Sequence, residues 1–167
     1  EQITEAGRRM AQTLSGGGNI YALGNGGSAA QSEHLAAELV GHFELERPAL
    51  RCRALTCNTS TLTAVGNDFD HESVFVRQVE GLVDADDLVV CMSTSGNSGN
   101  VLRAAEAAGR RGAVTIGLTG RDGGELAPLC DVAIRAPATS AARVQEAHLV
   151  VIHLLCGQVE QELHGAE

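Results

Sequence analysis

The chain has 167 residues, of which 44% are hydrophobic and 20% charged, with a mean hydropathy of +0.01. These values predict one globular domain with a single core, and no apolar run approaches the roughly 20 residues of a membrane-spanning helix. The formal net charge is −9 and aromatic residues make up only 2%, which leaves neither a basic surface nor stacking platforms for nucleic acid. We therefore expect no nucleic-acid and no membrane partner.

The basic and sulfur-containing residues narrow the chemistry further. All twelve basic residues are arginines, which excludes a Schiff base formed by a lysine of the chain. The five cysteines are scattered, lie mostly in apolar runs and form no C-x-x-C pair. We expect them to be buried thiols in a reducing cytoplasm rather than disulfides or a zinc knuckle.

Apolar runs and helical periodicities alternate along the whole chain. In chain order we expect helix 2–14, strand 19–23, helix 29–40, strand 51–56, helix 58–65 with a break at 66–68, helix 72–82, strand 88–92, helix 101–111, strand 113–118, a short helix 123–129, strand 132–135 and helix 140–163. This alternation predicts an α/β fold with a parallel sheet covered on both faces. Ligands of such sheets bind beyond the carboxyl ends of the strands.

A glycine-rich loop at 24–28 follows the first expected strand. With Ala29 it matches the looser dinucleotide-binding fingerprint. That interpretation needs an acidic residue at the end of the second strand, and residues 56–58 (Thr-Cys-Asn) offer none, so we expect no nucleotide cofactor. Asn25, Ser28 and the helix N–H groups could instead contact a phosphate or a sugar. A glycine turn that serves only close packing is the alternative.

The second loop, Ser93–Asn100, joins a buried strand to an alanine-rich helix and reads Ser-Thr-Ser-Gly-Asn-Ser-Gly-Asn. A helix N-terminus favours an anion because its N–H groups are unpaired and its dipole end is positive. Four hydroxyls within six residues, with Gly96 allowing close backbone approach, predict a phosphate site here. No Gly-Lys-Ser/Thr follows, so it is not a nucleotide P-loop. An ordinary N-cap with flexible turn residues is the alternative.

Two helices carry titratable side chains that could act on a bound ligand. His34 and Glu38 are four residues apart and therefore adjacent on one helix face. Polar residues also interrupt the apolar stripe of the last helix, where Gln145 and His153 are two turns, about 12 Å, apart. Hydrogen-bonded or solvated side chains without a catalytic role remain the alternative for both sets.

Five motifs occur in order: Gly24–Ser28, Leu62–Asp68, Ser93–Ser98, Leu118–Gly120 and Val144–His148. Together they resemble the phosphoheptose isomerase (sedoheptulose 7-phosphate isomerase) family of the sugar isomerase (SIS) domain superfamily. The resemblance runs from Asn19 to about Glu162. One departure is His42, which stands where some members have an arginine that contacts the sugar.

The resemblance implies a three-layer αβα sandwich with a five-stranded parallel sheet of flavodoxin-like type. It implies one SIS domain over residues 1–167, with residues 1–18 forming an N-terminal helix that contributes to an oligomer interface. The assembly is then a homotetramer with active sites between subunits. The implied activity is the isomerisation of sedoheptulose 7-phosphate, a small phosphosugar, to D-glycero-D-manno-heptose 7-phosphate.

The resemblance also assigns residues. It implies that the serine loop (Ser93, Thr94, Ser95 and Ser98) holds the phosphate, and that the substrate is further contacted by Asn25, Gly26, Ser28, Asn67, Asp68 and Gln145. Glu38 and His153 match the catalytic acid–base pair. One zinc ion per subunit would have the ligands His34, Glu38, Gln145 and His153.

Without lysine, an aldose–ketose interconversion proceeds through an enediol, which needs a base, an acid and a group that polarises the carbonyl. We expect Glu38 to act as the base and His153 as the acid. Two alternatives stay open: a non-catalytic phosphosugar-binding or scaffold protein of the same fold, and an isomerase for a related phosphosugar in a specialised pathway.

Overall fold

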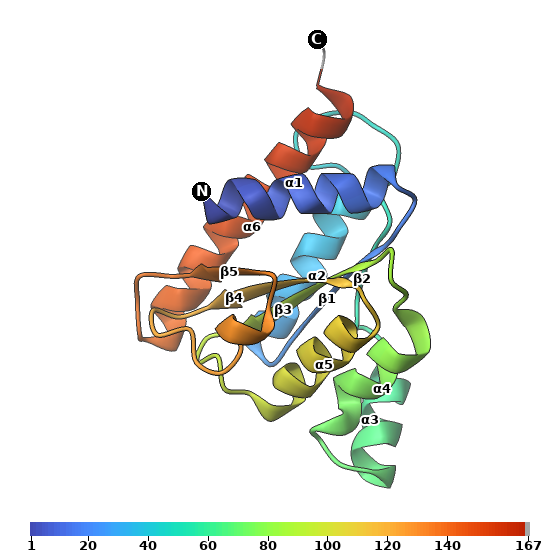
Figure 1. Ribbon diagram of the computed structural model, residues 1–167, viewed down its shortest axis with the longest axis vertical. Helices are drawn as coiled ribbons and strands as arrows, with labels where there is room; N and C mark the ends of the chain where they lie inside the picture. Colours follow the sequence, from blue (N-terminus) through green and yellow to red (C-terminus); the bar gives the residue numbers. More distant parts are fainter. Residues whose placement is uncertain (166–167) are drawn as a thin grey trace.

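The computed structural model describes residues 1–165 (Figure 1). Its helices are α1 (Gln2–Ser15), α2 (Gly27–Val40), α3 (Thr59–Asp68), α4 (Ser73–Leu82), α5 (Gly99–Arg110) and α6 (Ala141–His164), with a 3-10 turn η1 (Ala127–Leu129). Its strands are β1 (Ile20–Gly24), β2 (Cys52–Ala54), β3 (Leu88–Ser93), β4 (Val114–Thr119) and β5 (Val132–Arg135). None of the helices in this part of the chain is long and apolar enough to cross a membrane.

The five strands form one parallel sheet in the order β2-β1-β3-β4-β5. Helices α1, α2 and α6 cover one face and α3, α4 and α5 lie on the other, which makes three layers (Figure 1). The predicted αβα sandwich with a five-stranded parallel sheet of flavodoxin-like order is confirmed.

Alternation along the strands divides the core into two halves. In β3, Leu88, Val90 and Met92 pack toward α1, α2 and α6. Val89 and Cys91 pack toward α4 and α5, where small residues such as Ala104 let the helix approach the sheet closely. Because every residue of β3 is buried, the strand reads as a continuous apolar run, as expected at the centre of a sheet covered on both faces.

Two expected helix boundaries are wrong. The helix predicted to break at residues 66–68 continues to Asp68, because Gly66 keeps a helical backbone and the N–H of Phe69 bonds to the carbonyl of Val65. The helix predicted over 123–129 is reduced to η1, because Gly123 and Gly124 have φ values of 79° and 55°. The remaining predicted helices and strands are present with shifts of a few residues at their ends.

All five cysteines are free thiols. Cys91 and Cys156 are buried as predicted, Cys52 and Cys130 are half-buried, and Cys57 is exposed, contrary to the expectation of burial. Burial raises the pKa of Cys52, Cys130 and Cys156 to about 12, so these three stay protonated at neutral pH.

Candidate active site

The loops that follow β1 and β3 lie side by side at the carboxyl edge of the sheet. In the order β2-β1-β3-β4-β5, the chain reverses direction across the sheet between β1 and β3, which are paired up to Gly24 and Met92. In open α/β sheets the ligand crevice lies at this switch point. The structure therefore brings together the two loops that the sequence singled out.

The serine loop gathers its hydroxyls at the N-terminus of α5. Ser93 Oγ lies 3.0 Å from Ser98 Oγ and 3.5 Å from Ser95 Oγ. Ser98 occupies the N-cap position but its side chain makes no capping hydrogen bond, and the first turn of α5 contains no acidic residue. Hydroxyl donors and the positive end of the helix thus face the same region, as an anion site requires.

Gly96 fixes the shape of this loop. Its φ of 70° is in the left-handed region, and a side-chain carbon at this position would collide with the backbone of Gly123. The N–H of Leu126 donates to the Gly96 carbonyl (2.9 Å), and the N–H of Glu125 donates to Asn97 Oδ1 (2.9 Å). The segment around residue 124 therefore packs against the serine loop and holds it in this conformation.

A pair of amides joins the two loops. Asn25 Nδ2 donates to Asn100 Oδ1 (2.8 Å), and Asn100 Nδ2 donates back to Asn25 Oδ1 (2.9 Å). Asn100 is buried in the first turn of α5, and its Nδ2 also lies 3.2 Å from Nε2 of His71, in the turn between α3 and α4. No motif in the sequence pointed to His71.

The other residues predicted to bind substrate are spread more widely. Gly26 caps α2 with a φ of 56°, and Ser28 is buried in its first turn. Gln145 packs its side chain against Gly27, close to the same loop. Asn67 and Asp68 are exposed at the end of α3, and among residues 1–165 no hydrogen bond links them to either loop.

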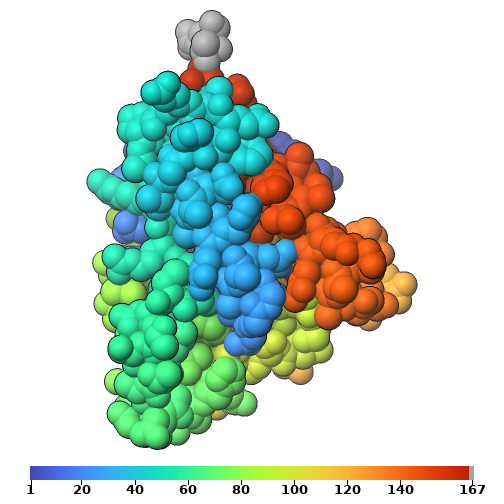
Figure 2. All heavy atoms as spheres, turned by 180° about the vertical axis from the view of Figure 1, so that it is seen from behind, coloured from blue at the N-terminus to red at the C-terminus, as the bar shows by residue number. Residues whose placement is uncertain are grey.

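The predicted acid–base residues meet where α2 and α6 run side by side, on the face shown in Figure 2. His34 Nε2 lies 3.3 Å from Glu38 Oε1 and 3.0 Å from His153 Nε2. The ring of Phe43 stacks on His153 with centroids 5.4 Å apart. The side chain of Glu38 is 24% exposed and that of His34 39%, so a ligand can reach both.

By donor type this cluster suits zinc, which takes imidazole nitrogens and carboxylate oxygens. Tetrahedral ligands about 2.0–2.1 Å from zinc are separated from one another by roughly 3.3 Å, close to the two separations around His34 Nε2. However, the two imidazole nitrogens face each other, and within the described part of the chain no group of three or more His, Cys, Asp or Glu side chains is arranged to hold a metal ion. Gln145, the fourth predicted ligand, lies near Gly27 instead.

The glycine-rich loop and Glu38 lie toward opposite ends of α2. Glu38 follows the first residue of α2 by eleven positions, which is about 16 Å along the helix axis. An extended seven-carbon phosphate spans roughly 10 Å from phosphorus to the first carbon by standard bond lengths. Glu38 therefore lies farther along α2 from the glycine-rich loop than such a molecule is long.

A buried carboxylate missed by the sequence analysis holds the segment after α2. Glu160, 1% exposed, accepts the N–H groups of Phe43, Glu44 and Leu45 at 2.8–2.9 Å and Nε of Arg47 at 2.9 Å. Burial by itself raises the pKa of this carboxyl group, but these donors outweigh it and hold the pKa at about 2. The one signal in the sequence was its position, which continues the apolar stripe of α6.

Arg47 extends the same network to α2. It donates to the carbonyl oxygens of Leu39 (2.8 Å) and Glu38 (2.9 Å). The pair Glu160–Arg47 thus fixes the end of α2, which carries Glu38, and the loop that carries Phe43.

His148, part of the motif on the last helix, is a core residue. It is fully buried, and its Nε2 lies 3.0 Å from the carbonyl oxygen of Thr119, which it donates to, while Nδ1 has no partner among the described residues. Burial lowers the pKa of His148 in spite of this hydrogen bond. The neutral imidazole therefore joins α6 to the end of β4.

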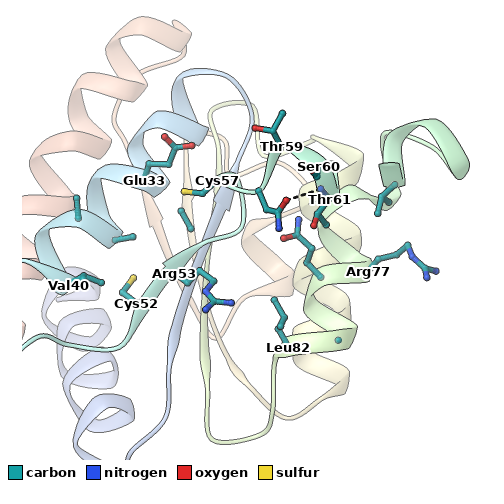
Figure 3. Close-up of a pocket in the computed structure, with 17 residues that line it drawn as sticks. Glu33, Val40, Cys52, Arg53, Cys57, Thr59, Ser60, Thr61, Arg77 and Leu82 are labelled. Atoms are coloured by element: carbon teal, nitrogen blue, oxygen red, sulfur yellow. Dashed lines mark hydrogen bonds between the residues drawn. The ribbon is translucent and has the colours of Figure 1, made fainter. Parts of the chain in front are cut away.

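A hollow of about 1050 Å³ lies away from these residues, between α2, β2, α3 and α4 (Figure 3). Its two arginines do not converge: Arg77 extends away from Arg53, with its guanidinium 4.1 Å from the centre of the Phe69 ring. Small and apolar residues make up much of the wall, including Ala36 and Val40. It contains no predicted site residue, so the candidate site rests on the loops and the Glu38 cluster.

The family model of the SIS domain matches residues 1–120. A phosphoheptose isomerase from Alkalilimnicola ehrlichii is 48% identical over 168 residues, covering 99% of this chain and 86% of the relative. The solved structure of a phosphoheptose isomerase from Neisseria gonorrhoeae superposes with a TM-score of 0.90 at 44% identity, over 96% of this chain and 85% of that one. The corresponding enzyme from Francisella tularensis gives a TM-score of 0.92 at 37% identity with the same coverage.

Proposed function

We propose that this chain, which belongs to the phosphoheptose isomerase branch of the SIS domain family, converts sedoheptulose 7-phosphate to D-glycero-D-manno-heptose 7-phosphate. The observation that carries the proposal is the cluster of Glu38, His34 and His153 between α2 and α6. A protein that only binds a phosphosugar needs the serine loop but has no use for a carboxylate and two imidazoles at a second position.

In this proposal the serine loop binds the phosphate. The hydroxyls of Ser93, Ser95 and Ser98 donate to its oxygens, with Thr94 beside them, and the N-terminus of α5 adds its dipole. Because the chain carries a net charge of −9, neutral hydroxyls and backbone dipoles provide a local attraction within a repulsive field. Asn25, Gly26, Ser28 and Gln145 flank this loop, and Asn67 and Asp68 complete the proposed substrate contacts.

Glu38 is the proposed base that removes a proton from the carbon next to the carbonyl. His153 is the proposed acid that protonates the carbonyl oxygen. Glu38 then returns its proton to the neighbouring carbon of the enediol, while the hydroxyl on the first carbon gives its proton back to His153. Positioned acid–base groups contribute typically 10²–10⁴-fold to a rate. The contact of His34 with both groups supports this assignment, because it holds the carboxylate and the second imidazole in one hydrogen-bonded chain.

We further propose that active sites are shared between copies in a homotetramer, with residues 1–18 contributing to an interface. The support is the separation of about 16 Å along α2 between Gly27, at the glycine-rich loop, and Glu38, which is longer than the substrate. The serine loop and Gln145 of one copy would then face the Glu38 cluster of another.

One zinc ion per subunit is the proposed metal, with ligands from His34, Glu38, His153 and Gln145. A bound zinc would supply Lewis-acid polarisation of the substrate carbonyl. The donor types of the cluster support this part of the proposal. The cytoplasm is the proposed location, supported by the five free thiols.

The test is to incubate the protein with sedoheptulose 7-phosphate and follow the sugar by NMR. We expect an aldose phosphate with the wild type and at least a hundredfold slower turnover with Glu38→Gln. Glu33→Gln is the matched control, because Glu33 lies on the same helix and, within residues 1–165, its side chain bonds only to Thr56. Binding without turnover, turnover of a different phosphosugar alone, or a Glu38→Gln variant that keeps most of its rate would each contradict the proposal.

A further inference from the structure

Phe43 contacts α6 at three successive turns. Its ring stacks on the imidazole of His153, with centroids 5.4 Å apart and an angle of 28° between the planes. The same ring covers Gly157, where a side-chain carbon would lie 3.5 Å from Cε1 of Phe43. The backbone N–H of Phe43 donates to Oε1 of Glu160 at 2.8 Å. Because positions 153, 157 and 160 follow one face of a helix, α6 holds both the ring and the main chain of Phe43.

The side of α6 that carries His153 is open. A hollow of about 410 Å³ borders the imidazole, with Val150, Leu154 and Gly157 in its wall. Val150 and Leu154 are 60% and 52% exposed, and the glycine one turn after His153 has no side chain to support the imidazole. Without the ring of Phe43, the imidazole would have room to turn toward this hollow and into another rotamer.

The contact with His34 determines which edge of the imidazole faces the cluster. Nε2 of His153 lies 3.0 Å from Nε2 of His34. A rotation of the His153 ring by 180° about its bond to Cβ would keep the stacking on Phe43, but it would put a carbon in place of Nε2 and break the hydrogen bond. Phe43 therefore sets the plane of the ring and His34 sets the edge, and the two contacts together define one orientation.

We propose that Phe43 is a positioning residue for His153: its ring keeps the imidazole in the plane in which Nε2 reaches the Glu38 cluster. This inference rests on the proposed function, in which His153 is the acid. A catalytic group displaced by about 1 Å can lower a rate about 10²-fold, so the loss of the Phe43 ring acts on kcat. The serine loop belongs to other elements, so the binding of the phosphate is left unchanged.

The first experiment needs no substrate. In the full chain labelled with 15N-histidine, the Nε2 signals of His34 and His153 are assigned by glutamine variants and compared at one fixed pH. We expect Phe43→Leu to shift the Nε2 signal of His34, because the hydrogen bond from His34 to His153 weakens. Phe43→Tyr, which keeps a flat ring, should leave this signal in place.

Phe75→Leu is the matched control. Phe75 is 2% exposed in the core on the opposite face of the sheet, so the variant removes the same atoms without touching the cluster. It should lose more stability in urea unfolding than Phe43→Leu, yet leave the His34 signal unchanged. An unmoved His34 signal in Phe43→Leu, or an equal shift in Phe75→Leu, overturns the inference.

The second experiment measures kcat and KM for sedoheptulose 7-phosphate. Phe43→Leu should lower kcat about tenfold to a hundredfold with KM within about threefold of the wild type, and Phe43→Tyr should restore kcat to within about threefold. Phe75→Leu should keep the wild-type kcat. A wild-type kcat in Phe43→Leu, or an equal loss in Phe43→Tyr, overturns the inference. A His34 signal that shifts as expected in a protein that does not convert the sugar would instead contradict the proposed function, and the catalytic consequence drawn here with it.

Discussion

Replacing Glu160 by glutamine should destabilise the protein by about 2–4 kcal/mol at pH 7. Oε1 of Glu160 accepts Phe43 N–H and Arg47 Nε, while Oε2 accepts Glu44 N–H and Leu45 N–H. Glutamine has one oxygen, so two of the four donors lose their acceptor in either orientation of the amide. Each buried donor left without a partner costs about 1–3 kcal/mol.

The pKa of the same carboxylate gives a second value for this effect. Its displacement from the ordinary 4.5 to about 2 corresponds to about 3 kcal/mol in favour of the ionised form. Because the pKa is lowered in the folded state, the stabilisation is complete above pH 4.5 and is lost as the pH falls toward 2. The difference between wild type and Glu160→Gln should therefore shrink as the pH decreases from 5 to 3.

Urea unfolding at pH 7, 5, 4 and 3 measures both effects. Far-ultraviolet circular dichroism detects the unfolding, because the chain has no tryptophan and one tyrosine. All variants are compared at one protein concentration, since assembly would add to the apparent stability. Glu162→Gln is the matched control: Glu162 is exposed on the same helix, and its loss should change stability by less than about 0.5 kcal/mol. A Glu160→Gln variant as stable as this control, or a difference independent of pH, would refute the reasoning.

Three further predictions concern the loops and the core. Gly96→Ala should cost more than about 2 kcal/mol, since its φ of 70° and the backbone of Gly123 leave no room for a side chain; urea unfolding measures it, and an unchanged midpoint contradicts it. Ser95→Ala should raise KM for the phosphosugar about tenfold and change kcat by no more than a few-fold, whereas the control Ser15→Ala should leave both constants unchanged. Equal KM values of the two variants in steady-state kinetics would contradict a phosphate contact of Ser95. His148→Gln should flatten the dependence of stability on pH between pH 7.5 and 5.5. In the wild type, the unfolded chain takes up a proton on His148 at a pKa of about 6.5, whereas burial lowers the pKa of the folded imidazole, so stability falls with pH. An unchanged slope in the variant would contradict a neutral, buried His148.

Local features of the site could be predicted from the sequence. The serine loop is contiguous, and its place between a buried strand and a helix follows from the apolar pattern alone. Likewise, His34 and Glu38 are neighbours through the spacing of a helix, and they lie 3.3 Å apart in the structure. The topological switch point follows from the strand order, which the resemblance implied and the structure confirms.

Contacts between distant segments could not be predicted in this way. The approach of His34 and His153, 119 residues apart, depends on how α2 and α6 pack, and no local pattern fixes this. The partners of Glu160 could not be predicted, because three of them are backbone N–H groups that carry no sequence signal. The same holds for the contact of His71 with Asn100, which exists only once α5 and the turn after α3 are placed together.

The most direct test of the account follows the conversion of sedoheptulose 7-phosphate in D₂O by proton NMR, with the wild type and with Glu38→Gln. With the wild type we expect an aldose phosphate in which at least part of the product carries solvent deuterium on the second carbon, because a proton passes through Glu38 during the enediol step. With Glu38→Gln we expect no such product above background. Product without any deuterium, or the same labelled product from both proteins, would contradict the assignment of Glu38 as the base.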